Sequence, residues 1–175
     1  MLNATEILQA QLAHGLGLDR YATIMNSDPS SPDFQRAFNG YYRIRRNEKW
    51  RKCYYGLFEK ARKDHYSFEQ IITELFKLTG NIEASFSSKM LATIDADMPI
   101  WDSKVLAVLK LKVSGTKADM RLSNTVLLYD RICAWYQDYL KTDNAKSMIR
   151  RFDAEFPEFQ SISPTKKIDF ILWAS

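Results

Sequence analysis

The chain has 175 residues, of which 46% are hydrophobic and 26% are charged, and its formal net charge is +4. These values are typical of a globular domain with its own core, and they exclude an intrinsically disordered chain. The six glycines and five prolines are too few for a turn-rich β-sandwich. We therefore expect a single domain over residues 1–175, with a break in the chain near 27–32.

No pattern typical of a membrane, metal or cofactor site is found in the sequence. The opening residues lack a positively charged region and include Glu6 in their apolar stretch, and no run of 18 apolar residues follows, so neither a signal peptide nor a membrane span is expected. Cys53 and Cys133 lie within helical apolar patterns, which favours buried thiols in a reducing compartment. His14 and His65 lack the spacing of metal ligands. We expect a cytoplasmic protein that needs no metal or cofactor.

Helix signals begin near the N-terminus. A capping-box pattern opens a first helix at Asn3, glycines end it near 15–17, and residues 19–26 form a further turn or two. The serine- and proline-rich stretch 28–32 then breaks the chain. Within it, Ser31 precedes a proline and is expected to cap the next helix.

The middle of the chain continues in the same way. Two apolar stripes between residues 34 and 61 do not share a phase, which predicts two helices or one helix kinked near Asn47. Ser67 opens another capping box, and Gly80 stands where the end of a helix takes a positive φ. The next helix is expected over about 82–94.

The last third of the chain is also helical by pattern. Asp102 begins a short helix through Leu111, and a long helix follows over about 116–141. Two further helices are expected, one over about 144–156 and one that begins at Ser163-Pro164. No strand is predicted, so the fold class is all-α with eight or nine helices.

One stretch of the chain resembles a known family. Residues 78–105 read LTGNIEASFSSKMLATIDADMPIWDSKV. They resemble the hairpin and catalytic-aspartate stretch of helix-hairpin-helix DNA glycosylases, especially the adenine mismatch branch, where a Leu-Pro-Gly-Val-Gly hairpin, a helix and a Pro-Ile-x-Asp turn follow one another. The positions that match without a gap are Leu78, Gly80, Pro99, Ile100, Asp102 and Val105. The resemblance implies a glycosylase-like helical domain, with its characteristic segment over about 67–113.

The stretch also departs from the family. Thr79 stands at the hairpin's proline and Ile82 at its second glycine, so the hairpin that would hold a DNA phosphate near Gly80 must be reshaped. Bifunctional members carry a nucleophilic lysine where this chain has Ala84, and Lys89 lies more than a turn further along. The cysteines of the family's C-terminal cluster are absent. The resemblance therefore implies a monofunctional or non-catalytic relative.

Asp102 is the candidate catalytic residue that the resemblance implies. Breaking an N-glycosidic bond builds positive charge on the sugar, which a carboxylate can stabilise while it orients a water. The alternative is that Asp102 only caps a helix, and the two roles are compatible. Trp101 is a candidate for the base pocket, with a place in the core as its alternative.

A basic, aromatic segment is the second candidate feature. Residues 36–63 contain ten Lys or Arg and two Glu, a net charge of +8. The segment is either a phosphate-binding surface with tyrosines for base stacking or a solvated helix face. The candidate phosphate-binding residues are Arg43, Arg45, Arg46, Lys49, Arg51 and Lys52, together with Gly80 of the hairpin, and the candidate base-pocket residues are Tyr41, Tyr42 and Trp101.

These features predict a glycosylase-like protein with DNA as its partner, and specifically a monofunctional N-glycosylase that acts on a flipped base. Two alternatives stay open: a non-catalytic nucleic-acid-binding protein of the same fold, and a helical protein-interaction or regulatory module. An aromatic pocket in a positive groove beside Asp102 favours the enzyme. An exposed apolar patch without such a groove favours the interaction module.

Overall fold

The computed structural model describes residues 17–174, and in this range the chain is helical without a strand. The all-α fold class is thereby confirmed for the described residues, and the helix predicted at Asn3 lies outside them. The described helices are α2 (Leu18–Met25), α3 (Pro32–Tyr41), α4 (Glu48–Asp64), α5 (Phe68–Thr79), α6 (Ala84–Ile94), α7 (Ser103–Val108), α8 (Ala118–Tyr139), α9 (Asp143–Glu155) and α10 (Pro164–Ala174), with a 3₁₀ turn η1 (Pro157–Phe159) before α10.

Local capping signals place most of the helix ends where the sequence predicts them. The Ser31 side chain accepts a hydrogen bond from a backbone N–H in the first turn of α3, and Ser67 forms the complete capping box of α5. Gly80 ends α5 with a φ of 72°. The two apolar stripes belong to two separate helices, α3 and α4, and Asn47 caps the second of them by accepting from the N–H of Trp50 at 2.9 Å.

Helix α7 is shorter than the sequence predicts, because it ends at Val108 rather than at Leu111. Lys110 adopts a φ of 54°, and the N–H of Leu111 turns back to the carbonyl of Leu106 at 2.9 Å. This left-handed ending closes the helix early.

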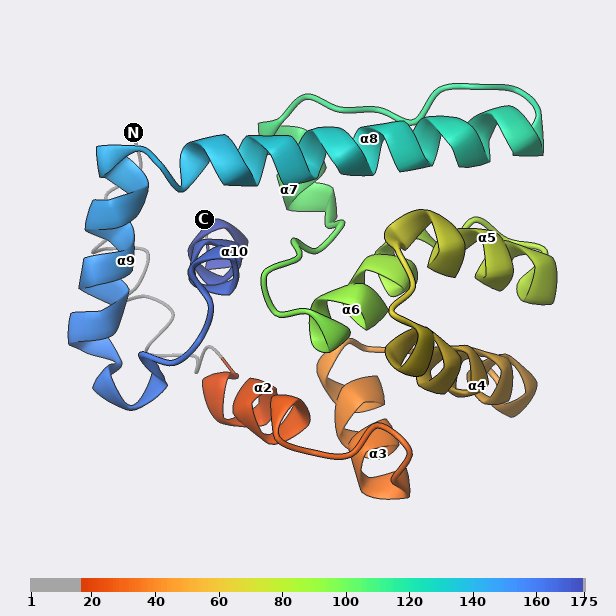
Figure 1. The fold of residues 1–175 in the computed structure, drawn as a ribbon, viewed down its shortest axis with the longest axis horizontal. Helices are drawn as coiled ribbons and strands as arrows, with labels where there is room; N and C mark the ends of the chain where they lie inside the picture. The colour runs from red at the N-terminus through yellow and green to blue at the C-terminus, as the bar shows by residue number, and fades with distance from the viewer. Residues whose placement is uncertain (1–16, 175) are drawn as a thin grey trace.

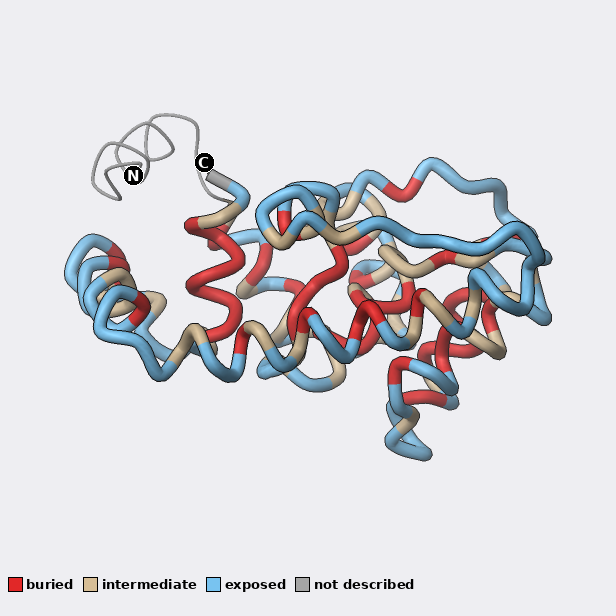
Figure 2. The backbone as a smooth tube through the Cα atoms, turned by 90° about the horizontal axis from the view of Figure 1, so that it is seen from above, coloured by how far each residue is buried: buried red, intermediate tan, exposed pale blue. Residues whose placement is uncertain are grey.

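In Figure 1, α10 is seen end-on beside α9, and α3, α4 and α5 lie on the opposite side of the molecule. α4, α5 and α6 pack against one another in chain order, α5 also packs against α8, and α10 contacts both α7 and α9. α10 is buried over residues 165–171 and is drawn mostly in red beside the C label in Figure 2. A helix from the end of the chain therefore lies inside the molecule.

The core is rich in aromatic side chains whose hydroxyl groups have acceptors. Tyr54 donates to the carbonyl of Phe86 at 2.9 Å, and Tyr129 donates to the carbonyl of Pro99 at 2.7 Å. Tyr129 also stacks on Phe68, with ring centroids 3.8 Å apart. Since a buried hydroxyl without a partner is costly, these bonds tie Tyr54 to the first turn of α6 and Tyr129 to the loop before α7.

The described part of the chain has no candidate membrane span and no candidate metal site. Over residues 17–174, none of the helices has the combined length and apolarity of a membrane span. In the same range, no group of three or more His, Cys, Asp and Glu is arranged to hold a metal ion. Cys53 and Cys133 are half-buried free thiols.

Candidate functional site

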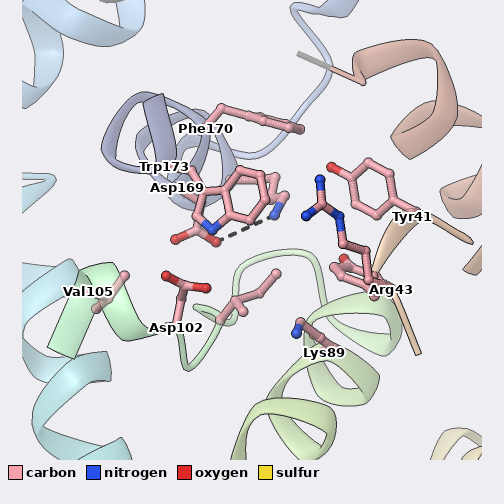
Figure 3. Close-up of a pocket in the computed structure, with 11 residues that line it drawn as sticks. Tyr41, Arg43, Lys89, Asp102, Val105, Asp169, Phe170 and Trp173 are labelled. Carbon is pink, nitrogen blue, oxygen red and sulfur yellow. Dashed lines mark ion pairs between the residues drawn. The ribbon is translucent and has the colours of Figure 1, made fainter. Parts of the chain in front are cut away.

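A cavity of about 140 Å³ lies between the end of α3, α6, the start of α7 and α10 (Figure 3). An apolar cavity of about 150 Å³ holds a benzene molecule, so this space fits one six-membered ring. Its aromatic wall consists of Tyr41, Tyr42, Phe170 and Trp173. Aromatic walls suit a planar ligand, because rings stack on one another with favourable geometry.

Asp102 lies on the wall of this cavity, and its carboxylate points into it (Figure 3). Its Oδ1 accepts the backbone N–H of Lys104 at 2.8 Å, so the residue is also the N-cap of α7. The structure thus combines the two arrangements that the sequence left open, a helix cap and a carboxylate beside an aromatic cavity.

The loop before Asp102 is held on two sides. The backbone N–H of Trp101 donates to the Ser88 hydroxyl of α6 at 2.8 Å, and the carbonyl of Pro99 accepts from Tyr129 of α8. Trp101 itself is buried with 7% of its surface exposed, and it does not line the cavity. The structure therefore places Trp101 in the core, where it positions its neighbour Asp102 through the backbone.

Two lysines, Lys89 and Lys166, line the same cavity. The Lys89 ammonium donates to the Ser85 hydroxyl at 2.9 Å and lies 5.5 Å from the centre of the Tyr42 ring. Burial lowers the pKa of Lys89, an effect that the carboxylate of Asp102 opposes and the ammonium of Lys166 reinforces. Lys89 is therefore electrostatically coupled to Asp102 in one small space.

Lys166 belongs to a buried charged group on α10. Its ammonium lies 3.7 Å from the Asp169 carboxylate, and the Tyr136 hydroxyl donates to the other oxygen of that carboxylate. Burial lowers the pKa of Lys166, although Asp169 and Asp102 oppose this effect. Burial likewise raises the pKa of Asp169, against the influence of Lys166 and Tyr136.

The two tyrosines predicted for a base pocket both lie at the cavity. Tyr41 is the last residue of α3 and Tyr42 follows it, with their ring centroids 4.8 Å apart in an edge-on arrangement. Burial raises the pKa of each hydroxyl above its usual value. Both phenols therefore stay protonated at neutral pH and can donate hydrogen bonds.

The basic residues predicted to bind phosphate occupy different environments. Arg43 is exposed and lines the cavity, so it lies at the mouth. Arg46 is bound to the buried carboxylate of Glu83, with Nη2–O distances of 2.7 and 3.0 Å, and its guanidinium lies 5.6 Å from the Trp50 ring. The other four lie at the start of α4 or just before it, with Arg51 half-buried and the rest exposed: Arg45, Lys49, Arg51 and Lys52.

The turn between α5 and α6 has polar groups that are partly engaged within the protein. Gly80 is exposed, and its N–H donates to the carbonyl of Phe76 at 2.8 Å. Thr79, which stands at the hairpin's proline, accepts the N–H of Asn81 at 3.3 Å and donates to the carbonyl of Leu75 at 2.7 Å. The departure at Thr79 therefore ties up a backbone donor that the resemblance would assign to a phosphate.

Five cavity residues were missed by sequence reasoning: Lys89, Lys166, Asp169, Phe170 and Trp173. A signal for three of them was present, because positions 166, 169 and 173 follow one another at helical spacing on one face. Charged residues within the apolar stripe of a buried helix indicate a site. Lys89 had no such signal, since it lies among small polar residues that also suit a solvated helix face.

Compared with known proteins, the chain matches no family model, and no curated protein or solved structure is significantly similar to it.

Proposed function

We propose that this chain is a monofunctional DNA N-glycosylase, which hydrolyses the bond between a flipped base and its sugar. The observation that carries the proposal is the carboxylate of Asp102, which points into a ring-sized aromatic cavity. A base that leaves the duplex needs such a pocket, lined with rings on which it can stack.

The chemistry assigned to Asp102 follows from its place on the wall. With the base in the cavity, the sugar lies at the mouth, where positive charge develops as the glycosidic bond breaks. A carboxylate there stabilises that charge and orients the attacking water. One oxygen of Asp102 is fixed by the N–H of Lys104, so the group is held in place before the substrate arrives.

The basic residues supply the contact with DNA. Arg43 lies at the mouth, where the phosphate beside a flipped nucleotide would come, and exposed Arg45, Lys49 and Lys52 extend the positive surface along the start of α4. Such contacts give affinity and register without reading the sequence of the DNA. Arg46 is left out of this set, because its charge is already paired with Glu83.

The test is single-turnover base release from duplexes that each contain one damaged or mismatched base, with Asp102→Asn and Asp102→Ala as variants. Asparagine caps a helix about as well as aspartate, so the Asn variant should keep its melting temperature, and the Ala variant should lose about 1 kcal/mol. The Asn variant should nevertheless release base about 10²–10⁴ times more slowly. Full activity of Asp102→Asn, or no release from any duplex by the unaltered protein, would contradict the proposal.

A further inference from the structure

The buried helix α10 carries two lysines, and the structure treats them differently. Lys167 is 4% exposed and has two close partners, since its ammonium lies 2.5 Å from the Asp153 carboxylate and donates to the carbonyl of Gln160 at 2.8 Å. It does not line the cavity. Lys166 does line the cavity, and its only ion-pair partner among the described residues is Asp169.

The pair formed by Lys166 and Asp169 has unused hydrogen-bonding capacity. Their N–O distance of 3.7 Å is too long for a hydrogen bond, and no other bond of the ammonium is found within residues 17–174. The Tyr136 hydroxyl donates to Oδ1 of Asp169, and the backbone N–H of Ile100 also acts on this carboxylate, while the buried Oδ2 has no hydrogen bond of normal geometry. The Lys166 ammonium lies instead over rings, 4.9 Å from that of Phe170 and 5.3 Å from that of Tyr21.

This arrangement favours a ligand that supplies the missing hydrogen-bond partners. A buried charge without hydrogen-bond partners costs free energy, and native structures leave few such groups unsatisfied. Here a donor and an acceptor lie side by side on one face of α10, and both line a cavity that fits one ring. Figure 3 shows the ion pair beside Trp173 and Phe170, with Asp102 on the neighbouring wall.

We propose that Lys166 and Asp169 form the recognition floor of the cavity and bind a planar ring that carries a hydrogen-bond acceptor next to an N–H donor on one edge. The Lys166 ammonium donates to the acceptor, and the carboxylate of Asp169 accepts from the N–H. Phe170 and Trp173 pack against the ring. The Watson–Crick edge of a nucleobase has this pattern, so the biological ligand is a flipped base, an identification that rests on the proposed function.

The first test uses the unaltered full chain and three small probes of one ring each, followed by ligand-observed NMR. 2-Pyridone carries a carbonyl next to an N–H, N-methyl-2-pyridone keeps the carbonyl and loses the N–H, and benzene keeps only the ring. Hydrogen bonds to charged groups predict that 2-pyridone binds about ten to a hundred times more tightly than the other two. Equal binding of all three probes, or binding of none, would overturn the proposal.

The second test removes the floor without leaving a lone charge. Replacing a buried ion pair by neutral groups of similar volume is often harmless to stability, so Lys166→Met/Asp169→Asn should keep the melting temperature at or above that of the unaltered protein. It should lose the preference for 2-pyridone over N-methyl-2-pyridone. Asp169→Asn alone keeps the shape of the side chain, and the ratio of 2-pyridone affinity to N-methyl-2-pyridone affinity should fall at least tenfold. This single variant tests the proposal if the double variant does not fold.

A matched control is available on the same helix. Lys167→Met/Asp153→Asn removes an ion pair outside the cavity and should leave the probe preference unchanged. If the cavity variants still prefer 2-pyridone, or if this control loses the preference equally, Lys166 and Asp169 do not recognise the ring.

Because the probes contain no glycosidic bond, their binding is independent of base release. A 2-pyridone preference without base release from any duplex would retain the floor and refute the glycosylase. Base release without the preference would refute the floor alone.

Discussion

The ion pair between Arg46 and Glu83 gives the sharpest prediction about stability. It joins the loop 42–47, which carries basic residues, to the hairpin that follows α5. The Glu83 side chain is 8% exposed and that of Arg46 is 42% exposed, so the carboxylate is buried while water reaches the guanidinium. Arg46 also lies over the rings of Trp50 and Phe86, each 5.6 Å from its Cζ.

The magnitude for Arg46→Ala follows from these exposures. Removing one partner of a fully buried ion pair costs about 3–5 kcal/mol, and removing one partner of an exposed pair costs about 0–1 kcal/mol. Since Arg46 is partly solvated, we expect about 2 kcal/mol from the uncompensated carboxylate of Glu83, and about 0.5–1 kcal/mol more from the lost ring contact. The total is about 2–3 kcal/mol.

Urea denaturation followed by circular dichroism measures this free energy of unfolding directly, and thermal melting should show a fall of about 5–10 °C for a chain of this size. Arg45→Ala, at the exposed neighbouring position, should stay within about 0.5 kcal/mol of the unaltered protein. The double variant Arg46→Met/Glu83→Gln should recover part of the loss, because no buried charge is left. A loss below about 0.5 kcal/mol for Arg46→Ala would refute the reasoning.

Three further outcomes are expected. Neutralising Arg45 and Lys49 together should reduce the slope of log K for DNA binding against log salt concentration by about 2. Lys146→Ala should leave this slope unchanged, and salt-independent binding would contradict a nucleic-acid partner. Borohydride should trap no covalent complex with substrate DNA, whereas trapping that disappears in Lys89→Ala would make that lysine a nucleophile and the enzyme bifunctional. Burial raises the pKa of Cys133 to about 11. Because the folded state holds this proton more tightly, the thiol's contribution is complete below about pH 8.5 and is lost as the pH rises towards 11; Cys133→Ala should flatten the fall in unfolding free energy over that range, and an unchanged slope would contradict this.

The parts of the fold that the sequence predicted are those with local causes. Ser31 and Ser67 cap helices with their own side chains, and Gly80 supplies a backbone conformation that other residues adopt at a cost. Asp102 was identified as a helix start for the same reason. The predicted end of α7 was wrong because Lys110, a residue without turn preference, takes the positive φ that is usual for glycine.

The candidate site was predictable only in part, because its walls come from distant segments. Tyr41, Tyr42, Arg43 and Asp102 were named from motifs and composition, and the structure brings all four to one cavity. Trp101 was also named, and it lies in the core instead. The contribution of α10 depends on how that helix packs against α7 and α9, which no local pattern specifies.

The burial of α10 also bears on the order in which the molecule is made. A chain leaves the ribosome with its N-terminus first, and contacts between distant segments form late because closing long loops costs entropy. Tyr41 and Trp173 face one cavity although more than a hundred residues separate them. A nascent chain therefore displays the basic residues of 43–52 before the cavity exists. During synthesis the walls from α3, α6 and α7 are therefore made first, and the cavity is complete only when α10 has docked.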